Sequence, residues 1–292
     1  MHQKAKYVNH NGKLRSADKP LLYADNRSFR YGDGLFETVR IYNERMPLWP
    51  LHYQRLRKGM TILGIQAPAE WTEEALREQL LKTARKNKME DNARLRITVW
   101  RERGGSYLPR SQRGLFLIEC EKHHQEGFAL NKKGLQIDLY PFMEKTTTVV
   151  DNLKTTSALI YVMAARYARE NNVDDCLILN YHTRLCDGVS SNIFLIKDEK
   201  IQTPPLSEGC VDGVMRRYLI DIFKKEGIPF EEEPLNVEVP FMAEELFLTN
   251  AVRGIRWVSG FKAKRYSHTF TAEISTILEA YLSGRRNGLK SQ

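Results

Sequence analysis

The chain has 292 residues, of which 42% are hydrophobic and 28% are charged, and its formal net charge at pH 7 is +9. A typical domain holds about 100–200 residues, so this length favours two domains with well-filled cores. The basic residues are spread along the chain and no nucleic-acid module signature is present, so we expect no nucleic-acid partner. No apolar run approaches the ~20 residues of a membrane span, and residues 1–13 lack the apolar stretch of a signal peptide. We therefore expect a cytoplasmic protein with no membrane partner.

The sequence contains four cysteines: Cys120, Cys176, Cys186 and Cys210. None of them forms a CxxC pair, and no histidine cluster completes a metal site. We therefore expect free thiols and no bound metal.

The first half of the chain opens with short strands and continues with helices. Residues 35–42 read as a strand, and Asn43-Glu44 as a turn to a partner strand at 46–49. Pro50 then suits the first turn of a helix. The remaining elements of this half are two helices and two strands, the strands joined through Gly104-Gly105. They are expected at residues 51–63, 72–87, 94–101 and 115–120.

The polar residues 123–134 read as a linker between an N-terminal α/β domain, 1–122, and a C-terminal domain, 135–292. The C-terminal domain mixes strands and helices without the regular βαβ alternation of a Rossmann fold, which predicts an α+β class. Its strands are expected at 135–140, 176–179, 191–196, 200–203 and 246–249, and its helices at 157–170 and 213–226.

Lys154 is the first candidate catalytic residue. It lies between an extended segment and a helix start, and residues 153–161 are otherwise uncharged. A partly desolvated lysine amine has a lowered pKa and can form a Schiff base. Taken alone the signal is weak, because a lysine just before a helix is more often solvated.

Asp187 is a candidate acid for a pyridoxal phosphate site. It precedes Gly188 and an apolar strand, and such a site needs a carboxylate beside the protonated pyridine nitrogen to keep the ring an electron sink. The alternative is that Asp187-Gly188 forms only a hairpin turn.

Residues 204–216 contain a glycine-bearing loop that leads into a helix. The first backbone N–H groups of a helix have no intrahelical partners, so such a helix start can bind a phosphate. The alternative is an ordinary helix capped by Asp212. Arg55, one turn into an earlier helix, could bind the same phosphate through its guanidinium, or be an ordinary surface arginine.

The order and spacing of these features resemble the class IV aminotransferases, which include branched-chain aminotransferases, D-amino-acid aminotransferases and 4-amino-4-deoxychorismate lyases. The matching stretches follow the family's order and span most of the chain. They are Arg30 to Glu37, His52 to Leu56, Asn152 to Lys154, Asp187 to Phe194, Pro204 to Arg216, and Leu248 to Ala251.

The resemblance implies the two-domain pyridoxal-phosphate fold type IV, with pyridoxal 5′-phosphate between the domains and usually a homodimer. It makes Lys154 the lysine that forms the Schiff base and then moves the proton at the substrate Cα. Asp187 takes the place of the acid at the ring nitrogen. The phosphate is assigned to one arginine, to one helix start and to two residues of the last strand. These residues are Arg55, Gly213, Val214, Met215, Ala251 and Val252.

The resemblance also implies a substrate pocket lined by Tyr31 and Phe36, which the neighbouring subunit could supply. The loop 101–107 would help to choose the substrate, and its candidates are Arg101, Arg103 and Tyr107. Arginines there suit a substrate with two carboxylates.

Three positions depart from the family's pattern. Asp187 replaces the usual glutamate and is one methylene shorter. Leu159 stands five residues after the lysine, where a branched-chain aminotransferase usually has a tyrosine, which argues against a standard enzyme of that kind. Met215 replaces the usual threonine and leaves only backbone donors at that point of the phosphate site.

Three activities remain open on the sequence. A transaminase would convert an amino acid to a 2-oxo acid, whereas the lyase would release pyruvate from aminodeoxychorismate and leave 4-aminobenzoate. Residues 248–251 and the loop 101–107 resemble the lyase group, but many transaminases share these general features. A non-catalytic relative that binds the cofactor is the third possibility, and the combination of Lys154, Arg55 and the phosphate loop argues against it.

Overall fold

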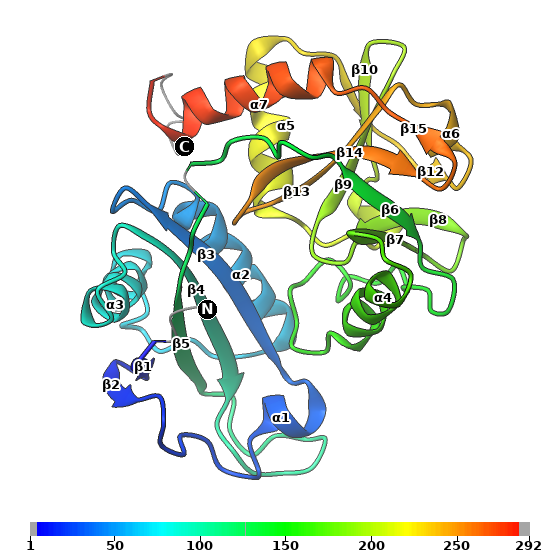
Figure 1. The fold of residues 1–292 in the computed structure, drawn as a ribbon. Helices are drawn as coiled ribbons and strands as arrows, with labels where there is room; N and C mark the ends of the chain where they lie inside the picture. The colour runs from blue at the N-terminus through cyan, green and yellow to red at the C-terminus, as the bar shows by residue number, and fades with distance from the viewer. Residues whose placement is uncertain (1–4, 126, 286–292) are drawn as a thin grey trace. The chain divides into compact units, whose positions relative to one another are not determined.

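The computed structural model describes residues 5–125 and 127–285. The chain divides into two compact units, each with its own sheet (Figure 1). Unit 1 comprises Met1–Glu126 and Leu153–Ala158, and unit 2 comprises Gly127–Asn152 and Leu159–Gln292. The short segment that carries Lys154 therefore belongs to unit 1, although it lies inside the range expected for the C-terminal domain.

Unit 1 is built on a five-stranded antiparallel sheet in the order β2-β1-β5-β4-β3. The strand expected at 94–101 is present and alternates, since Leu95, Ile97 and Val99 are buried and the residues between them are partly exposed. The strands are β1 (Tyr7–His10), β2 (Lys13–Ser16), β3 (Gly34–Tyr42), β4 (Asn92–Arg101) and β5 (Gly114–Lys122).

Three helices complete unit 1: α1 (Arg27–Tyr31), α2 (Trp49–Leu63) and α3 (Glu73–Lys86). The longer two cover the sheet, with α2 against β3, and α3 against β1, β4 and β5. Leu56 and Met60 of α2 and Leu80 of α3 are buried in the core of this unit. Helix α2 ends at Gly64, which has a left-handed backbone (φ 70°) that glycine adopts without steric cost.

The strand expected at 46–49 is wrong. Asn43 and Glu44 do form a left-handed turn, and Tyr42 pairs with Arg45, but the pairing stops there. Pro47 cannot donate a ladder hydrogen bond, and α2 already begins at Trp49.

Unit 2 contains a mixed sheet in the order β11-β10-β9-β13-β14-β6-β7-β8-β12, with β15 paired to β14. Parallel and antiparallel pairs alternate irregularly, and this confirms the expected α+β class. The strands are β6 (Leu135–Leu139), β7 (Asp175–Leu179), β8 (Arg184–Gly188), β9 (Asn192–Lys197), β10 (Lys200–Thr203), β11 (Phe230–Glu232), β12 (Leu235–Asn236), β13 (Glu245–Asn250), β14 (Gly254–Phe261) and β15 (Lys264–Arg265).

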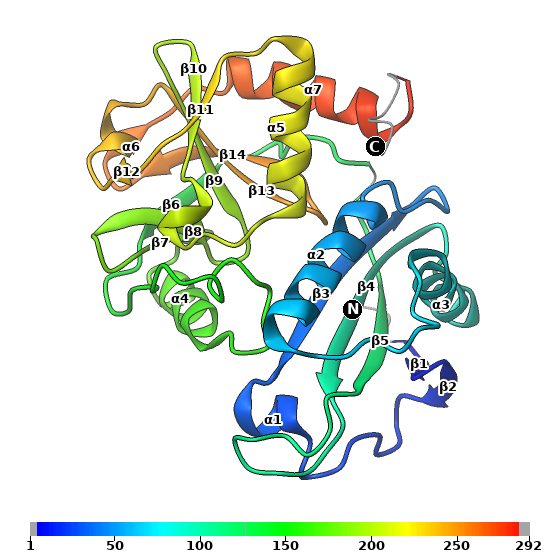
Figure 2. The same cartoon turned by 180° about the vertical axis from the view of Figure 1, so that it is seen from behind.

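The helices of unit 2 are α4 (Leu159–Glu170), α5 (Val214–Glu226), α6 (Val239–Met242) and α7 (Thr269–Leu282), with a 3-10 turn at Leu206–Glu208. Helix α4 packs on β7, α5 on β13, and α7 on β13 and β14 (Figure 2). The central strands β9 and β13 are buried on both faces, which explains their nearly continuous apolar sequences. Among the described residues, no helix is both long and apolar enough to cross a membrane.

Candidate functional site

The segment that carries Lys154 lies along the free edge of β3 in unit 1. The Phe36 N–H donates to the Lys154 carbonyl at 2.9 Å, and the Thr156 N–H donates to the Gly34 carbonyl at 2.9 Å. Leu153 is buried in the core of this unit. The backbone on both sides of Lys154 is therefore fixed by a strand rather than left in a loop.

The amine of Lys154 lies over an aromatic ring. Its Nζ is 4.6 Å from the centroid of the Phe36 ring, and the Arg96 guanidinium lies 3.6 Å from the same centroid. A small pocket in unit 1 contains Lys154 and Phe36 and also Arg55. The structure thus brings together three of the residues expected at the site.

Arg55 is bound to a buried carboxylate. Its Nε donates to Glu37 Oε1 at 2.7 Å and its Nη2 to Glu37 Oε2 at 2.5 Å, while His52 Nδ1 lies 2.6 Å from the same Oε2. Burial alone would raise the pKa of Glu37, but Arg55 and His52 lower it to about 2. Burial lowers the pKa of His52, so the ring is neutral and donates its Nδ1–H to Glu37. Glu37 therefore orients Arg55 from within unit 1.

The loop 101–107 is held by two arginines that share Asp33. Arg101 is buried and donates to Asp33, to Gln112 Oε1 at 2.7 Å and to the Leu63 carbonyl. Arg27, also buried, donates to Asp33 Oδ2 at 2.8 Å and to the Ser106 carbonyl at 2.6 Å. The Arg101 guanidinium thus fixes the base of the loop.

The other substrate candidates are exposed. Arg103 lies 4.1 Å from the centroid of the Tyr23 ring, and the rings of Tyr31 and Tyr107 are 5.6 Å apart. All of these side chains are accessible from solvent. They can therefore change contacts when a ligand binds, unlike Arg101.

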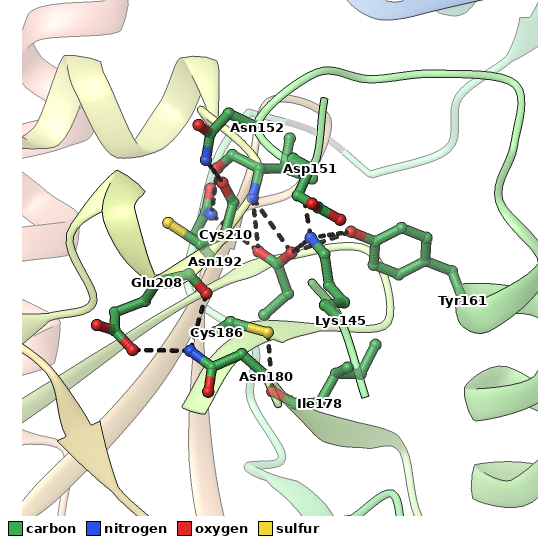
Figure 3. A network of polar contacts seen from close by, with 12 residues as sticks. Lys145, Asp151, Asn152, Tyr161, Ile178, Asn180, Cys186, Asn192, Glu208 and Cys210 are labelled. Atoms are coloured by element: carbon green, nitrogen blue, oxygen red, sulfur yellow. Dashed lines mark hydrogen bonds and ion pairs between the residues drawn. The ribbon is translucent and has the colours of Figure 1, made fainter. Parts of the chain in front are cut away.

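Asp187 is buried near the end of β8 in unit 2 and accepts several hydrogen bonds. Figure 3 labels its partners Lys145, Tyr161 and Asn192. Its Oδ2 accepts from Lys145 Nζ at 2.7 Å and from the Tyr161 hydroxyl at 3.0 Å. Its Oδ1 accepts from Asn192 Nδ2 at 3.2 Å, and the Val211 N–H lies 3.2 Å from both oxygens. The hairpin alternative is wrong, because the tight turn between β7 and β8 lies at Asn180–Thr183 and Asp187 is paired with Ile178 in the sheet.

The start of α5 has no side-chain cap. Gly213 is the N-cap residue and makes no side-chain hydrogen bond, so the alternative in which Asp212 caps the helix is wrong. The Asp212 carboxylate instead accepts from Arg217 at 2.7 and 2.6 Å. Val214 and Met215 are buried. The N-cap residue therefore offers no side-chain acceptor to the N–H groups of the first turn, and such a helix start is suited to an anion.

Gly213 is required by close packing. A Cβ atom at this position would lie 1.8 Å from Asn192 Oδ1, although the backbone (φ −66°) is one that any residue adopts. Asn192 cannot easily move, since its amide also donates to the Val211 carbonyl at 2.8 Å. The helix start and the Asp187 network therefore share one side chain.

Ala251 and Val252 form the turn after β13. Asn250 Oδ1 accepts from the N–H of Val252 at 3.1 Å and from that of Arg253 at 2.8 Å, which shapes this turn. The hydroxyl of Thr249, at the end of the same strand, is buried and has no hydrogen-bond partner among the described residues. An orphaned hydroxyl of this kind is suited to a ligand.

Five residues of these networks were not among the sequence candidates: Glu37, His52, Lys145, Tyr161 and Asn192. Glu37, His52 and Asn192 lie inside stretches that resemble the family's motifs. Their position in these stretches could have identified them as site candidates. Leu159 is exposed. Tyr161 lies two residues further along the chain, and the Tyr161 hydroxyl donates to Asp187. Lys145 has no local signal, because it lies 42 residues before its partner.

Comparisons with known proteins agree with the motifs. A family model described as amino-transferase class IV matches residues 34–261. The chain is 28% identical over 246 residues to a putative branched-chain-amino-acid aminotransferase of Methanocaldococcus jannaschii, covering 84% of each chain. It is 26% identical over 241 residues to an aminodeoxychorismate lyase of Vibrio harveyi, covering 82% of this chain and 86% of the relative.

The fold is similar to that of a solved structure. A branched-chain aminotransferase from Thermoproteus uzoniensis, crystallised with norvaline, superposes with a TM-score of 0.88 at 23% identity. The superposition covers 97% of this chain and 96% of that one. The resemblance and the fold type predicted from the motifs are confirmed.

Proposed function

The chain belongs to the class IV aminotransferase family, and from this premise we propose that it is a pyridoxal-phosphate enzyme in which Lys154 forms the Schiff base. Its substrate carries the amino group of an amino acid or of aminodeoxychorismate. The observation that carries the proposal is the lysine on the edge of β3, over the Phe36 ring and in one pocket with Arg55. Pyridoxal phosphate, when bound, supplies an electron sink for the charge that develops at the substrate Cα.

We propose that backbone donors of unit 2 and one arginine of unit 1 bind the phosphate of this cofactor. The uncapped start of α5 supplies backbone donors at Gly213, Val214 and Met215, and Arg55 supplies a guanidinium that Glu37 holds in place. We assign the turn at Ala251 and Val252 to the same group. The orphaned hydroxyl of Thr249, beside that turn in sequence, supports the assignment.

We propose that the Asp187 carboxylate pairs with the pyridine nitrogen of the cofactor. We propose that the Lys154 amine transfers the proton at the substrate Cα. The Asp187 carboxylate accepts hydrogen bonds from Lys145, Asn192 and the Val211 N–H, which fix its orientation for this role. Because the backbone around Lys154 is fixed, its amine can move only by rotation of the side chain. A proton can then be taken from and returned to one position.

We propose that Tyr31, Phe36, Arg103 and Tyr107 contact the substrate, and that Arg101 positions the loop. The hydrogen bonds of Arg101 to Asp33, Gln112 and Leu63 support the positioning role. Exposed Arg103 remains suited to a substrate carboxylate.

Aminodeoxychorismate lyase activity is the second candidate. It is supported by the arginine- and glycine-rich loop 101–107, by residues 248–251, and by the similarity to the Vibrio harveyi lyase. The similarity to branched-chain and D-alanine aminotransferases supports transamination instead.

We also propose a homodimer that works in the cytoplasm. Large apolar side chains are exposed on α1 and on the loop that follows β4, and a second copy would cover them. All four cysteines are free and buried, as is usual in a reducing compartment.

The visible spectrum of the purified protein with added pyridoxal phosphate tests the cofactor proposal. We expect an absorption band of the protein-bound cofactor in the native chain and its loss in Lys154→Ala, because no other amine is placed in that pocket. The matched control is Lys133→Ala, at an exposed position, which keeps the band. A chain that takes up no cofactor would contradict the proposal.

Two parallel incubations separate the activities. Pyruvate release from aminodeoxychorismate without any acceptor identifies the lyase. Turnover of branched-chain amino acids or D-alanine only with 2-oxoglutarate present identifies a transaminase.

A further inference from the structure

Lys145 lies in unit 2, in the segment between β6 and α4, with its backbone fixed beside β7. Its N–H donates to the Leu179 carbonyl at 2.9 Å, and its carbonyl accepts from the Tyr181 N–H at 3.0 Å. The residue as a whole is 5% exposed. A lysine is rarely buried to this extent without a partner of opposite charge.

The Lys145 ammonium group has a complete set of partners within unit 2 (Figure 3). It lies 2.7 Å from Asp187 Oδ2, 2.7 Å from the Tyr161 hydroxyl and 3.4 Å from the Asp151 carbonyl. An ammonium group has three donors, and three acceptors surround it here. Burial alone would lower the pKa of Lys145, but Asp187 raises it well above its ordinary value. The amine is therefore a permanent cation and not a second nucleophile.

Asp187 and Lys145 form a buried pair whose charges cancel. Both side chains are at most 4% exposed in this pair, so solvent does not weaken their attraction. The remaining neighbours of the carboxylate are neutral donors: Tyr161, Asn192 and the Val211 N–H. Removal of either charge would leave the other one buried and unpaired.

We propose that Lys145 is a built-in counter-cation of Asp187, which makes this carboxylate a weaker partner for the cofactor's ring nitrogen than an acid without such a cation. The inference rests on the proposed function, in which the Asp187 carboxylate pairs with the pyridine nitrogen of the cofactor. A proton on that nitrogen is stabilised by the negative charge beside it, and here one unit of positive charge opposes that stabilisation. Lys145 is thus a positioning and electrostatic residue that acts through Asp187. It weakens the electron sink without touching the substrate.

The affinity of purified protein for two compounds tests this proposal. One is pyridoxal 5′-phosphate and the other its 1-deaza analogue, in which a CH group replaces the ring nitrogen. In the native chain we expect dissociation constants that differ by less than about threefold, because the nitrogen makes only a weak contact. In Lys145→Met we expect the analogue to bind about tenfold less well than the natural cofactor, the effect of one charge-assisted hydrogen bond.

Two variants are matched controls. Lys145→Arg keeps the positive charge and should keep the native ratio of affinities. Tyr161→Phe removes a hydrogen bond to Asp187 but no charge, and it should also keep that ratio. A native ratio of tenfold or more, or an unchanged ratio in Lys145→Met, would overturn the proposal.

A measurement on the native holoprotein covers the case in which Lys145→Met does not fold. The nitrogen-15 chemical shift of ring-labelled cofactor distinguishes a protonated from a neutral ring nitrogen. We expect a ring nitrogen that is not fully protonated at neutral pH, and a nitrogen that is fully protonated there overturns the inference. If neither compound binds any variant, the proposed function itself fails, and the inference fails with it.

Discussion

Two buried carboxylates of the candidate site, Glu37 and Asp187, are each paired with a cation of their own unit. In unit 1 the Glu37 carboxylate takes two hydrogen bonds from Arg55 and one from His52, and in unit 2 Asp187 pairs with Lys145. A buried charge without such a partner would cost several kcal/mol. Each residue proposed to hold the cofactor through its charge is therefore oriented before any ligand arrives.

Glu37 should make the stability of the protein depend on pH under acidic conditions. Its pKa is about 2 in the folded protein and 4.5 ordinarily, so the folded state favours the charged form. The stabilisation, roughly 3 kcal/mol, is complete above pH 4.5 and is lost as the pH falls towards 2. Urea unfolding at several pH values measures this slope.

The variant Glu37→Gln isolates that contribution. We expect it to lower the free energy of unfolding at pH 7 by about 3–5 kcal/mol, because Arg55 is left buried without its partner, and to flatten the slope between pH 4.5 and 2. The control is Glu121→Gln, whose ion pair with Arg94 is exposed and should contribute less than about 1 kcal/mol. An unchanged slope in Glu37→Gln would contradict the role given to this carboxylate.

Sequence reasoning found the candidate site where spacing carries information and missed it where only the fold does. Lys154, Arg55 and Asp187 occupy positions in recognisable stretches, so their approximate roles follow from the order of motifs. Lys145 and Tyr161 meet Asp187 only because β6, β7 and β8 lie side by side in one sheet. No local pattern encodes such a contact between distant segments.

At the scale of elements, most of the expected helices and strands are present, including the short strand at 200–203, but one long strand was missed. The expected helix at 72–87 is α3, with Thr72 as its N-cap, and the expected strand at 94–101 lies within β4. Strand β14 was not predicted, although Gly254 starts it and Val258 is buried within it. Its pairing is parallel to β6 on one side and antiparallel to β13 on the other, which sequence alone does not show.

The start of α5 allows a test of the phosphate site at this scale. In Gly213→Ala, the new Cβ would lie 1.8 Å from Asn192 Oδ1, so the helix start or Asn192 must shift. We expect a loss of about 1–3 kcal/mol in stability and a roughly tenfold weaker affinity for pyridoxal phosphate. Urea unfolding and an absorbance titration measure the two effects.

Gly227→Ala is the matched control at the other end of α5. Gly227 has a left-handed backbone (φ 66°), and its Cβ would meet nothing within 4 Å. The substitution should cost about 1 kcal/mol in stability and leave the cofactor affinity unchanged. Equal affinity in Gly213→Ala and the native chain would contradict the assignment of this helix start to the phosphate.

At the scale of the whole molecule, a few hydrogen bonds join the segment 153–158 to unit 1. Residues 153–158 lie far from the rest of unit 1 in sequence, yet Lys154 and Thr156 pair with β3, and the Thr156 hydroxyl donates to the Gly32 carbonyl at 2.8 Å. The polar composition of residues 123–134 carries no information about a later segment that returns to unit 1.

The proposed homodimer gives the last prediction. Three large apolar side chains are exposed here: Phe29 on α1 (81%), and Tyr107 (88%) and Leu108 (81%) on the loop that follows β4. Arg27 of α1 donates hydrogen bonds to this loop. Exposed apolar side chains gathered in this way favour burial against a second copy. We expect light scattering to give the mass of two chains for the native protein and of one chain for Phe29→Glu combined with Leu108→Glu. The control, Met242→Glu on α6, replaces a half-exposed apolar side chain in unit 2 and should stay a dimer. A monomeric native protein would contradict the dimer, whereas a double variant that remains dimeric would place the interface elsewhere.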